Sequence, residues 1–274
     1  MRLLIESMEG SFLMQKGCYM GHVTCRRPLP GCLAIITGYG SQDNISGWHC
    51  HENHYLDFVL EGSEVERTKE GSYVRNVGTT TFYYPGDVHE TILRSTYSRC
   101  LILEFEPQFF HALGIKEVDI SELISSNSKR NISFVSIINE LINPDLDTNL
   151  SLVSLITAVF DLDGRSYSAH PPNWIVDARE YLNDNWYRLT TLHELSIITD
   201  LHPVTISKNF PKYFGCTLGE YKRKLRISRS IEMLMGTGVP LTDIAMQCGF
   251  ADQSHFTRTF RQLTGLVPKA VRRL

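Results

Sequence analysis

Short runs of branched and aromatic residues, separated by turn signals, fill the chain from about Cys32 to Phe105. Four of these runs are typical of strands: Leu33–Ile36, Tyr55–Leu60, Thr80–Tyr84 and Cys100–Phe105. Tripeptides that favour turns, such as Glu-Gly-Ser and Pro-Gly-Asp, lie between them. Strands with this regular spacing predict a small sandwich or barrel.

After Pro107 the apolar residues recur at helical spacing. They are Phe134, Ile137, Ile138 and Leu141, followed by Leu152, Leu155, Ile156 and Val159. We expect two or three helices here, whose apolar faces either pack inward or form a dimer surface. The polar segment 164–173, which contains two consecutive prolines, is typical of an interdomain linker.

Beyond the linker, each predicted helix has its own start and stop signals. Thr191 and Thr217 each precede a glutamate by three positions, which predicts two capping boxes. A helix from Leu192 to Thr199, a turn at 200–202 and a helix from Pro203 to Tyr213 follow one another. This order predicts a helix-turn-helix unit.

The same order recurs nearer the C-terminus. A helix from Leu241 to Cys248 and a helix from Asp252 to Leu263 flank a short turn, and a long helix over 218–235 joins the two units. Ala245 is small where the helices cross, and Gly249 is free to adopt a positive φ in the turn. A second helix-turn-helix unit is therefore predicted.

These patterns together predict an α+β protein of two domains. The N-terminal domain spans 1–163, with a barrel at about 30–106 and helices at about 107–160. The C-terminal domain spans 174–274 and is all-α.

Charge is divided unevenly between the two predicted domains. Residues 174–274 carry 14 basic against 9 acidic side chains, whereas the preceding residues carry 13 basic against 21 acidic. A basic C-terminal domain suits a nucleic-acid partner, because neutralised phosphates release counterions.

No run of apolar residues is long enough to cross a membrane, and the seven scattered cysteines suggest reduced thiols. We therefore expect a cytoplasmic protein.

About 28 positions of the second unit closely resemble the signature of the AraC/XylS transcription regulators. The matching residues include Ile244, Ala245, Cys248, Gly249, Phe250, Asp252, Gln253, Ser254, Phe256, Arg258, Phe260, Arg261, Thr264, Gly265 and Pro268. Phe210, Gly215, Tyr221, Leu225, Arg226 and Ile227 fit the weaker pattern of the first unit. The resemblance covers about 174–274 and implies two recognition helices in successive major grooves, about 34 Å apart.

The resemblance also implies which side chains contact DNA. Base contacts are expected from Val204, Ser207 and Lys208 in the first recognition helix and from Gln253, Ser254, Thr257 and Arg258 in the second. Phosphate contacts are expected from Lys212, Lys222, Arg261 and Arg272. Pro211 departs from helical preference, so we expect the first recognition helix to end early or to lie further from the DNA.

The predicted barrel resembles the cupin-type sensor domain that many of these regulators carry. His49 and His51 lie two apart, so a strand points both to one face, and His89 follows a Pro-Gly turn. Effector-binding candidates are Trp48, His49, His51, Tyr55, Phe82, Tyr84 and His89, whereas His54 and Glu90 are expected to be exposed. Three alternatives stay open: a polar effector pocket, a metal on His49, His51 and His89, or histidines that only complete the barrel core.

Metal-binding cupins usually have a glutamate where Tyr55 and Leu56 stand, which favours the effector pocket over the metal. We therefore expect no cofactor and no catalytic residues. The predicted function is that of a transcription regulator, more often an activator, which binds double-stranded promoter or operator DNA in response to a small molecule. RNA polymerase and a second copy of the chain are expected partners. A metal-dependent cupin enzyme fused to a DNA-binding domain is the alternative, and a regulator without any ligand is a third hypothesis.

Overall fold

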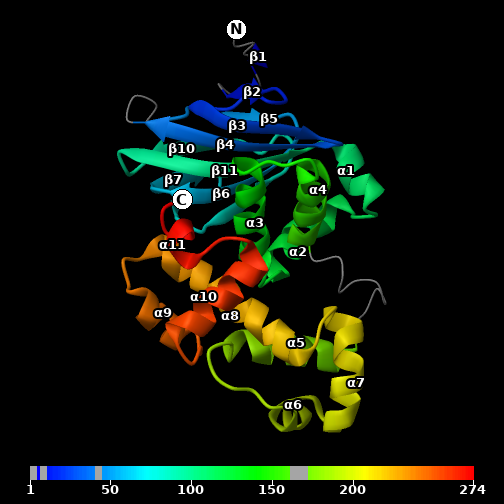
Figure 1. The fold of residues 1–274 in the computed structure, drawn as a ribbon. Helices are drawn as coiled ribbons and strands as arrows, with labels where there is room; N and C mark the ends of the chain where they lie inside the picture. Colours follow the sequence, from blue (N-terminus) through cyan, green and yellow to red (C-terminus); the bar gives the residue numbers. More distant parts are fainter. Residues whose placement is uncertain (1–4, 7–10, 41–44, 161–171) are drawn as a thin grey trace. The chain divides into compact units, whose positions relative to one another are not determined.

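The computed structural model describes residues 5–6, 11–40, 45–160 and 172–274 (Figure 1). Most of the predicted linker, residues 161–171, lies outside the described residues. The chain forms two compact units. One comprises residues 1–121, 140–150 and 274, and the other comprises residues 122–139 and 151–273.

Two β-sheets form most of the first unit. The strands are β1 (Ile5–Glu6), β2 (Phe12–Met14), β3 (His22–Leu29), β4 (Cys32–Gly40), β5 (His49–His51), β6 (His54–Glu61), β7 (Ser63–Thr68), β8 (Gly71–Asn76), β9 (Thr80–Tyr83), β10 (His89–Leu93) and β11 (Tyr97–Phe105). One sheet has the order β1-β2-β5-β10-β7-β8 and the other the order β3-β4-β11-β6-β9. Every strand pair is antiparallel except β2 with β5. The predicted strand-rich domain is confirmed, and we call these two sheets the barrel.

Long central strands and an apolar layer hold the second sheet together. β4 and β11 pair along nine positions, from Cys32 opposite Phe105 to Gly40 opposite Tyr97. Its inner face is a layer of buried side chains, namely Leu33, Ile35, Tyr55, Val59, Tyr83, Cys100 and Ile102.

None of the seven cysteines, all of which are described residues, forms a disulfide bond.

Helices follow the barrel, as predicted, although the two or three expected become four α-helices and one 3₁₀-helix among the described residues. They are α1 (Pro107–Ala112), the 3₁₀-helix η2 (Glu117–Asp119), α2 (Ile120–Ser126), α3 (Arg130–Ile142) and α4 (Thr148–Val159). Ile137, Leu141 and Leu152 are buried within the single chain. The inward-packing alternative therefore holds for these three residues, which leaves them unavailable as a dimer surface.

The C-terminal helices begin and end close to the predicted residues. They are α5 (Asn173–Asp184), α6 (Leu192–Thr199), α7 (Pro203–Phe214), α8 (Leu218–Gly236), α9 (Leu241–Gln247), α10 (Gln253–Thr264) and α11 (Pro268–Val271). Both capping boxes are present: Thr191 caps α6 with Glu194, and Thr217 caps α8 with Glu220. The helix-turn-helix order of α6–α7 and of α9–α10 is confirmed. No helix of the described residues is long and apolar enough to span a membrane.

The expectation that Pro211 shortens the first recognition helix is wrong. α7 continues three residues further, to Phe214, and Gly215 closes it in the left-handed region with a φ of 65°. Pro211 lies on the exposed side of the helix. Because Ser207, one turn earlier, is also exposed, its carbonyl group can bond to water in place of the missing N–H.

The turn of the second unit requires glycine at position 249. Gly249 has a φ of 72°, and a Cβ atom there would lie 2.4 Å from the carbonyl oxygen of Tyr187. We expect Gly249→Ala to lower the free energy of unfolding by about 2–4 kcal/mol, because left-handed strain and backbone overlap add together. Urea unfolding of the full chain measures this change.

Gly236→Ala is the matched control for this substitution. Gly236 lies at the end of α8, and a Cβ atom there meets nothing within 4 Å. Its stability is expected to stay within about 0.5 kcal/mol of the wild type, or to rise. Equal losses for both variants would contradict the role assigned to Gly249.

Candidate nucleic-acid interface and barrel cavity

Each recognition helix buries an apolar face. α7 buries Ile206, Phe210 and Phe214, and α10 buries Phe256 and Phe260. Asp252 caps α10 by accepting a hydrogen bond of 2.7 Å from the backbone N–H of His255. Because apolar residues and a cap fix one face of each helix, its other face is held toward solvent in a defined orientation.

The predicted base-reading residues lie on these solvent-facing surfaces. On α7, Val204, Ser207 and Lys208 are exposed at spacings of three and four, so they share one face. On α10, Gln253, Ser254 and Arg258 are exposed and Thr257 is half-buried. We call these two sets the reading faces.

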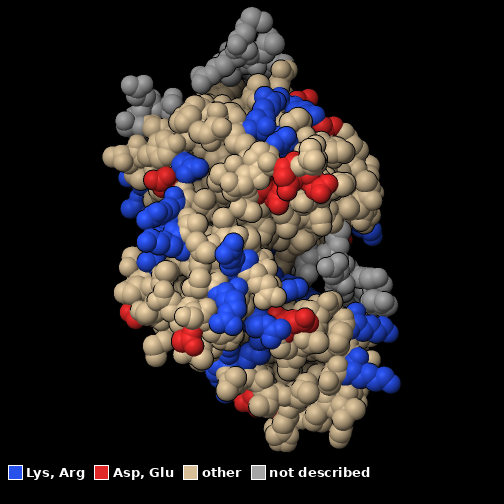
Figure 2. Space-filling model, viewed as in Figure 1, with Lys and Arg blue, Asp and Glu red and all other residues tan. Residues whose placement is uncertain are grey.

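The structure brings the four residues of the α10 reading face together in one open groove. Gln253, Ser254, Thr257 and Arg258 line it together with Arg261, Gln262 and Val267. A second groove is lined by Ser207 of α7 and by Arg223 of α8, which is exposed. Sequence reasoning did not select Arg223. Figure 2 shows that many Lys and Arg side chains of this part of the chain reach the surface.

Two of the four predicted phosphate contacts, Lys222 and Arg272, are less accessible than expected, and their contact with phosphate stays a prediction. Lys222 is only 8% exposed, and its ammonium group donates to the carbonyl oxygen of Arg188. Burial and the neighbouring charge of Arg226 lower the pKa of Lys222 to about 8. Arg272 likewise donates to the carbonyl oxygen of Val239. Both cations are engaged inside the helical domain, whereas Lys212 and Arg261 are exposed.

The guanidinium of Arg226 joins the two helix-turn-helix units. From α8 it donates to the carbonyl oxygens of Trp186 (3.3 Å) and Arg188 (3.3 Å), beside the first unit. It also donates to the carbonyl oxygen of Gly249 (2.8 Å), in the turn of the second unit. The same residue was part of the sequence resemblance, but its role was not predicted.

The barrel encloses a small cavity between its two sheets. The first sheet contributes His49 and His51 of β5 and His89 of β10, and the second contributes Tyr55 of β6 and Tyr83 of β9. The cavity volume is about 30 Å³. A water molecule requires roughly 10–15 Å³ by this measure, and sites for drug-sized ligands are on the order of 300 Å³ or more. The cavity therefore has room for an ion or one or two water molecules.

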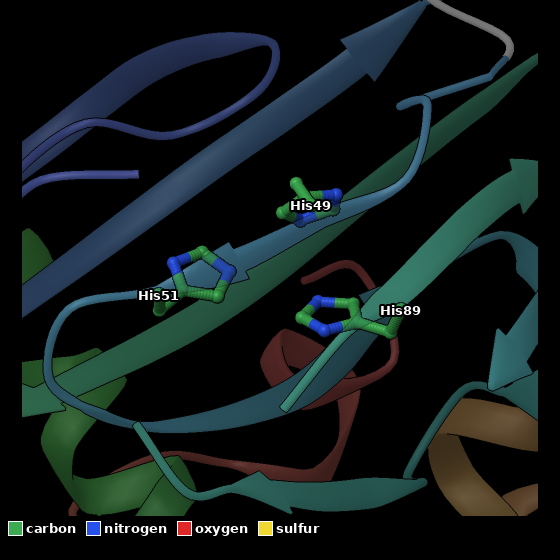
Figure 3. A group of neighbouring side chains, drawn as sticks. All are labelled: His49, His51 and His89. Carbon is green, nitrogen blue, oxygen red and sulfur yellow. The ribbon is translucent and has the colours of Figure 1, made fainter. Parts of the chain in front are cut away.

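Three imidazole rings meet at the wall of this cavity, and we call His49, His51 and His89 the histidine cluster (Figure 3). His49 and His89 are direct partners across β5 and β10, with ring centroids 4.3 Å apart. One ligand nitrogen from each of the three rings lies within 4.8 Å of the other two. The predicted convergence of these three residues is thus confirmed.

Hydrogen bonds orient the rings of the cluster. The Nδ1 atom of His49 lies 2.9 Å from the carbonyl oxygen of Gly47, and that of His89 lies 3.0 Å from the carbonyl oxygen of Asp87. A carbonyl oxygen only accepts, so each Nδ1 carries the hydrogen and Nε2 keeps its lone pair. The buried Nε2 atom of His51 has no hydrogen-bond partner.

Burial keeps the histidine cluster neutral. It lowers the pKa of His49, lowers that of His51 well below its usual range and lowers that of His89 to about 3. Tyr55 stacks on His51 and Tyr83 stacks on His89, each with ring centroids 4.2 Å apart. Neutral, oriented imidazoles can accept a hydrogen bond or a metal ion at Nε2.

The other predicted effector residues are placed elsewhere. The Trp48 ring lies beneath the guanidinium of Arg67, and Phe82 and Tyr84 pack around His54, so none of the three lines the cavity. His54 and Glu90 were expected to be exposed, and this was wrong. Both are buried, with His54 bonded to Glu117 and Glu90 bonded to Arg67.

A buried group of charged residues that sequence reasoning missed lies beside the histidine cluster. Arg75 of β8 is fully buried. Its Nη2 atom lies 2.7 Å from Oδ2 of Asp57. Its Nη1 atom lies 3.5 Å from Oε2 of Glu64 and 3.3 Å from Oε2 of Glu66. Burial raises the pKa of Glu64, and it raises that of Glu66 to about 7. One buried guanidinium thus contacts three carboxyl groups, and burial favours the neutral forms of Glu64 and Glu66.

Comparison with known proteins gives a clear result for the C-terminal part. Residues 195–274 match the family of helix-turn-helix domains. A bifunctional transcriptional activator and DNA repair enzyme of Bacillus subtilis, AdaA, is 30% identical over 37% of this chain and 48% of its own length. The transcriptional regulator GbdR of Pseudomonas aeruginosa is 30% identical over 28% of this chain and 21% of its own length. The chain therefore spans only a fifth to a half of these relatives.

A further relative matches over both parts of the chain. YobQ of Bacillus subtilis, an HTH-type transcriptional regulator, is 26% identical over 82% of this chain and 89% of its own length. Among solved structures, a regulator with an AraC-type DNA-binding domain from Chromobacterium violaceum is 21% identical over 37% of this chain, with a TM-score of 0.36. Residues 195–274 thus match the helix-turn-helix domain family, in agreement with the resemblance found in the sequence.

The bonds of Arg226 generate a test of the helical domain. We expect Arg226→Ala to lower the free energy of unfolding by about 2–3 kcal/mol, because the half-buried carbonyl groups of Trp186 and Gly249 lose a charged donor. Arg223→Ala is the control: it removes an exposed arginine of the same helix and should change stability by about 0.5 kcal/mol or less. Chemical denaturation compares the variants, and similar values for both would refute this role of Arg226.

Proposed function

We propose that this protein is a transcription regulator that binds specific double-stranded DNA through α7 and α10. The observation that carries the proposal is the pair of reading faces, which two separate helix-turn-helix units present on one helical domain. A helix fits the major groove, where each base pair displays a distinct pattern of donors and acceptors. The regulatory function named for the relatives agrees with this arrangement.

The side chains of the two faces suit base recognition. Arg258 can bond guanine O6 and N7 with two parallel N–H groups, and Gln253 can pair with adenine. Val204 offers methyl groups that can contact the methyl group of thymine. Lys212 and Arg261, which are exposed, are the proposed phosphate contacts, and they position the domain without reading sequence.

The remaining parts of the proposal concern control. The chain acts as an activator that contacts RNA polymerase, it associates with a second copy, and the barrel governs DNA binding through a small effector. An effector can do so only by binding two arrangements of the protein with different affinity. The rival hypothesis of a metal-dependent enzyme requires space for a substrate beside the histidine cluster, and the cavity of about 30 Å³ offers none.

Selection of binding sites from a pool of random duplexes tests the proposal. We expect enriched sites with two half-elements about 10–10.5 bp apart, which is one helical turn. Arg258→Ala should weaken binding to the selected site by about 1–3 kcal/mol and relax the preference at one position. Arg258→Lys is the matched control, because it keeps the charge but loses the planar pair of donors. If both variants bind like the wild type, Arg258 does not read a base.

The salt dependence of DNA binding separates surface cations from buried ones. Lys208→Ala should reduce the slope of log K against log salt by about 1 if Lys208 meets a phosphate, and should leave it unchanged if it meets a base edge alone. Lys222→Ala should leave the slope unchanged, since its ammonium group is bonded to the carbonyl oxygen of Arg188. A reduced slope for Lys222→Ala would show that this buried lysine reaches the DNA.

A further inference from the structure

We propose that a groove between α7 and α10 binds the sugar-phosphate backbone of the DNA between the two half-elements, with Arg223 of α8 as the phosphate contact. Ser207, Arg223 and His255 line this groove, and we call it the central groove. The proposal rests on the proposed function and adds to it a binding site that lies outside the two reading faces.

The first argument is the position of the central groove. Ser207, which belongs to the α7 reading face, contributes to one wall. His255, which follows Ser254 of the α10 reading face, contributes to the other. Arg223 and the first turns of α8 line the groove between these walls. The central groove therefore lies between the two reading faces.

The second argument is the shape of double-stranded DNA. Two recognition helices in successive major grooves lie about 34 Å apart on one face of the duplex. The minor groove between them then faces the protein and is bordered by the backbones of both strands. Because a minor groove is only about 6 Å wide, a side chain that approaches it meets the phosphates before the base edges. The central groove is thus placed to receive the backbone.

The third argument is charge. The cations Lys222, Arg223 and Arg226 line the central groove, and no acidic side chain of the described residues does so. Lys222 and Arg226 both donate to the carbonyl oxygen of Arg188, so their charges are held in place. The groove is open to solvent and has a volume of about 600 Å³. Positive charges fixed along such a groove attract an anionic backbone.

The fourth argument is that Arg223 is available to a ligand. Its side chain is exposed, and no hydrogen bond or ion pair within the described part of the chain engages its guanidinium. Glu220, three residues earlier on α8, attracts Arg223. However, the backbone N–H and the hydroxyl of Thr217 already donate to Oε2 of Glu220, at 2.8 Å each. Arg223 can therefore give two parallel N–H groups to a phosphate without losing a bond within the chain.

The salt dependence of DNA binding tests Arg223. We expect Arg223→Ala to weaken binding of the full-length protein to the selected site about 10-fold and to reduce the slope of log K against log salt by about 1. Lys224→Ala is the matched control, because Lys224 is the next residue of the same helix but does not line the central groove. It should leave the slope unchanged. Equal slopes for the wild type and Arg223→Ala overturn the proposal.

Neutral linkages in the DNA locate the contact. Methylphosphonates replace the phosphates between the two half-elements, and in a control duplex they replace phosphates beyond the outer ends of the half-elements. We expect the central replacement to weaken wild-type binding about 10-fold and the outer replacement to leave it unchanged. Arg223→Ala should be insensitive to the central replacement, because it has already lost the contact. Equal losses for both proteins would show that Arg223 is not the group that binds these phosphates.

Site selection repeated with Arg223→Ala separates a phosphate contact from base reading. We expect the same half-elements and the same bases between them, because a phosphate contact carries no sequence information. A lost preference for A·T pairs between the half-elements would show that Arg223 reads the minor groove instead, which contradicts the proposal. If the wild type selects no site, the proposed function fails. If it selects a site but tolerates neutral central linkages, only the central groove is refuted.

Discussion

The two reading faces depend on how Arg226 fixes one helix-turn-helix unit relative to the other. Its guanidinium reaches carbonyl groups beside the first unit and in the turn of the second. A planar group with five donors on three nitrogen atoms can reach acceptors that lie far apart, whereas the three donors of a lysine all start from one nitrogen. Gly249 makes the contact possible, since any larger residue would collide with the carbonyl of Tyr187. This contact, together with the packing of α8 against α7, α9 and α10, joins the two units in one helical domain.

The barrel differs from the helical domain because charged side chains are buried in its interior. On β8, Tyr73 and Val74 are exposed whereas Arg75 is buried, and on β7 the buried residues are Glu64 and Glu66. Such an interior is expensive unless its charges pair, and the pairing here is incomplete. His51 and Glu64, which both line the cavity, each have a buried polar atom without a hydrogen-bond partner.

Agreement between sequence and structure is closest in the helical domain. The predicted limits of α6 are those observed, and both capping boxes are formed. Pro211 was misjudged because a proline disrupts a helix less where its ring and the freed carbonyl face water. Lys222 and Arg272 are less exposed than expected for another reason. A basic residue on a helix was assumed to face solvent, but neighbouring backbone carbonyls bind both side chains inside the domain.

The sequence by itself determined the helix ends, the two helix-turn-helix units and the approach of His49, His51 and His89. These features depend on residues a few positions apart or on a repeated pattern of local signals. Only the tertiary structure decided that Glu64, Arg75 and Tyr83 line the cavity with the histidines and that Trp48, Phe82 and Tyr84 do not. The pairing of the strands decides which side chains line the cavity. Thr91 of β10 lies opposite Glu66, and Glu64 lies opposite Arg75, in a register set by the pairing of whole strands rather than by their local sequence.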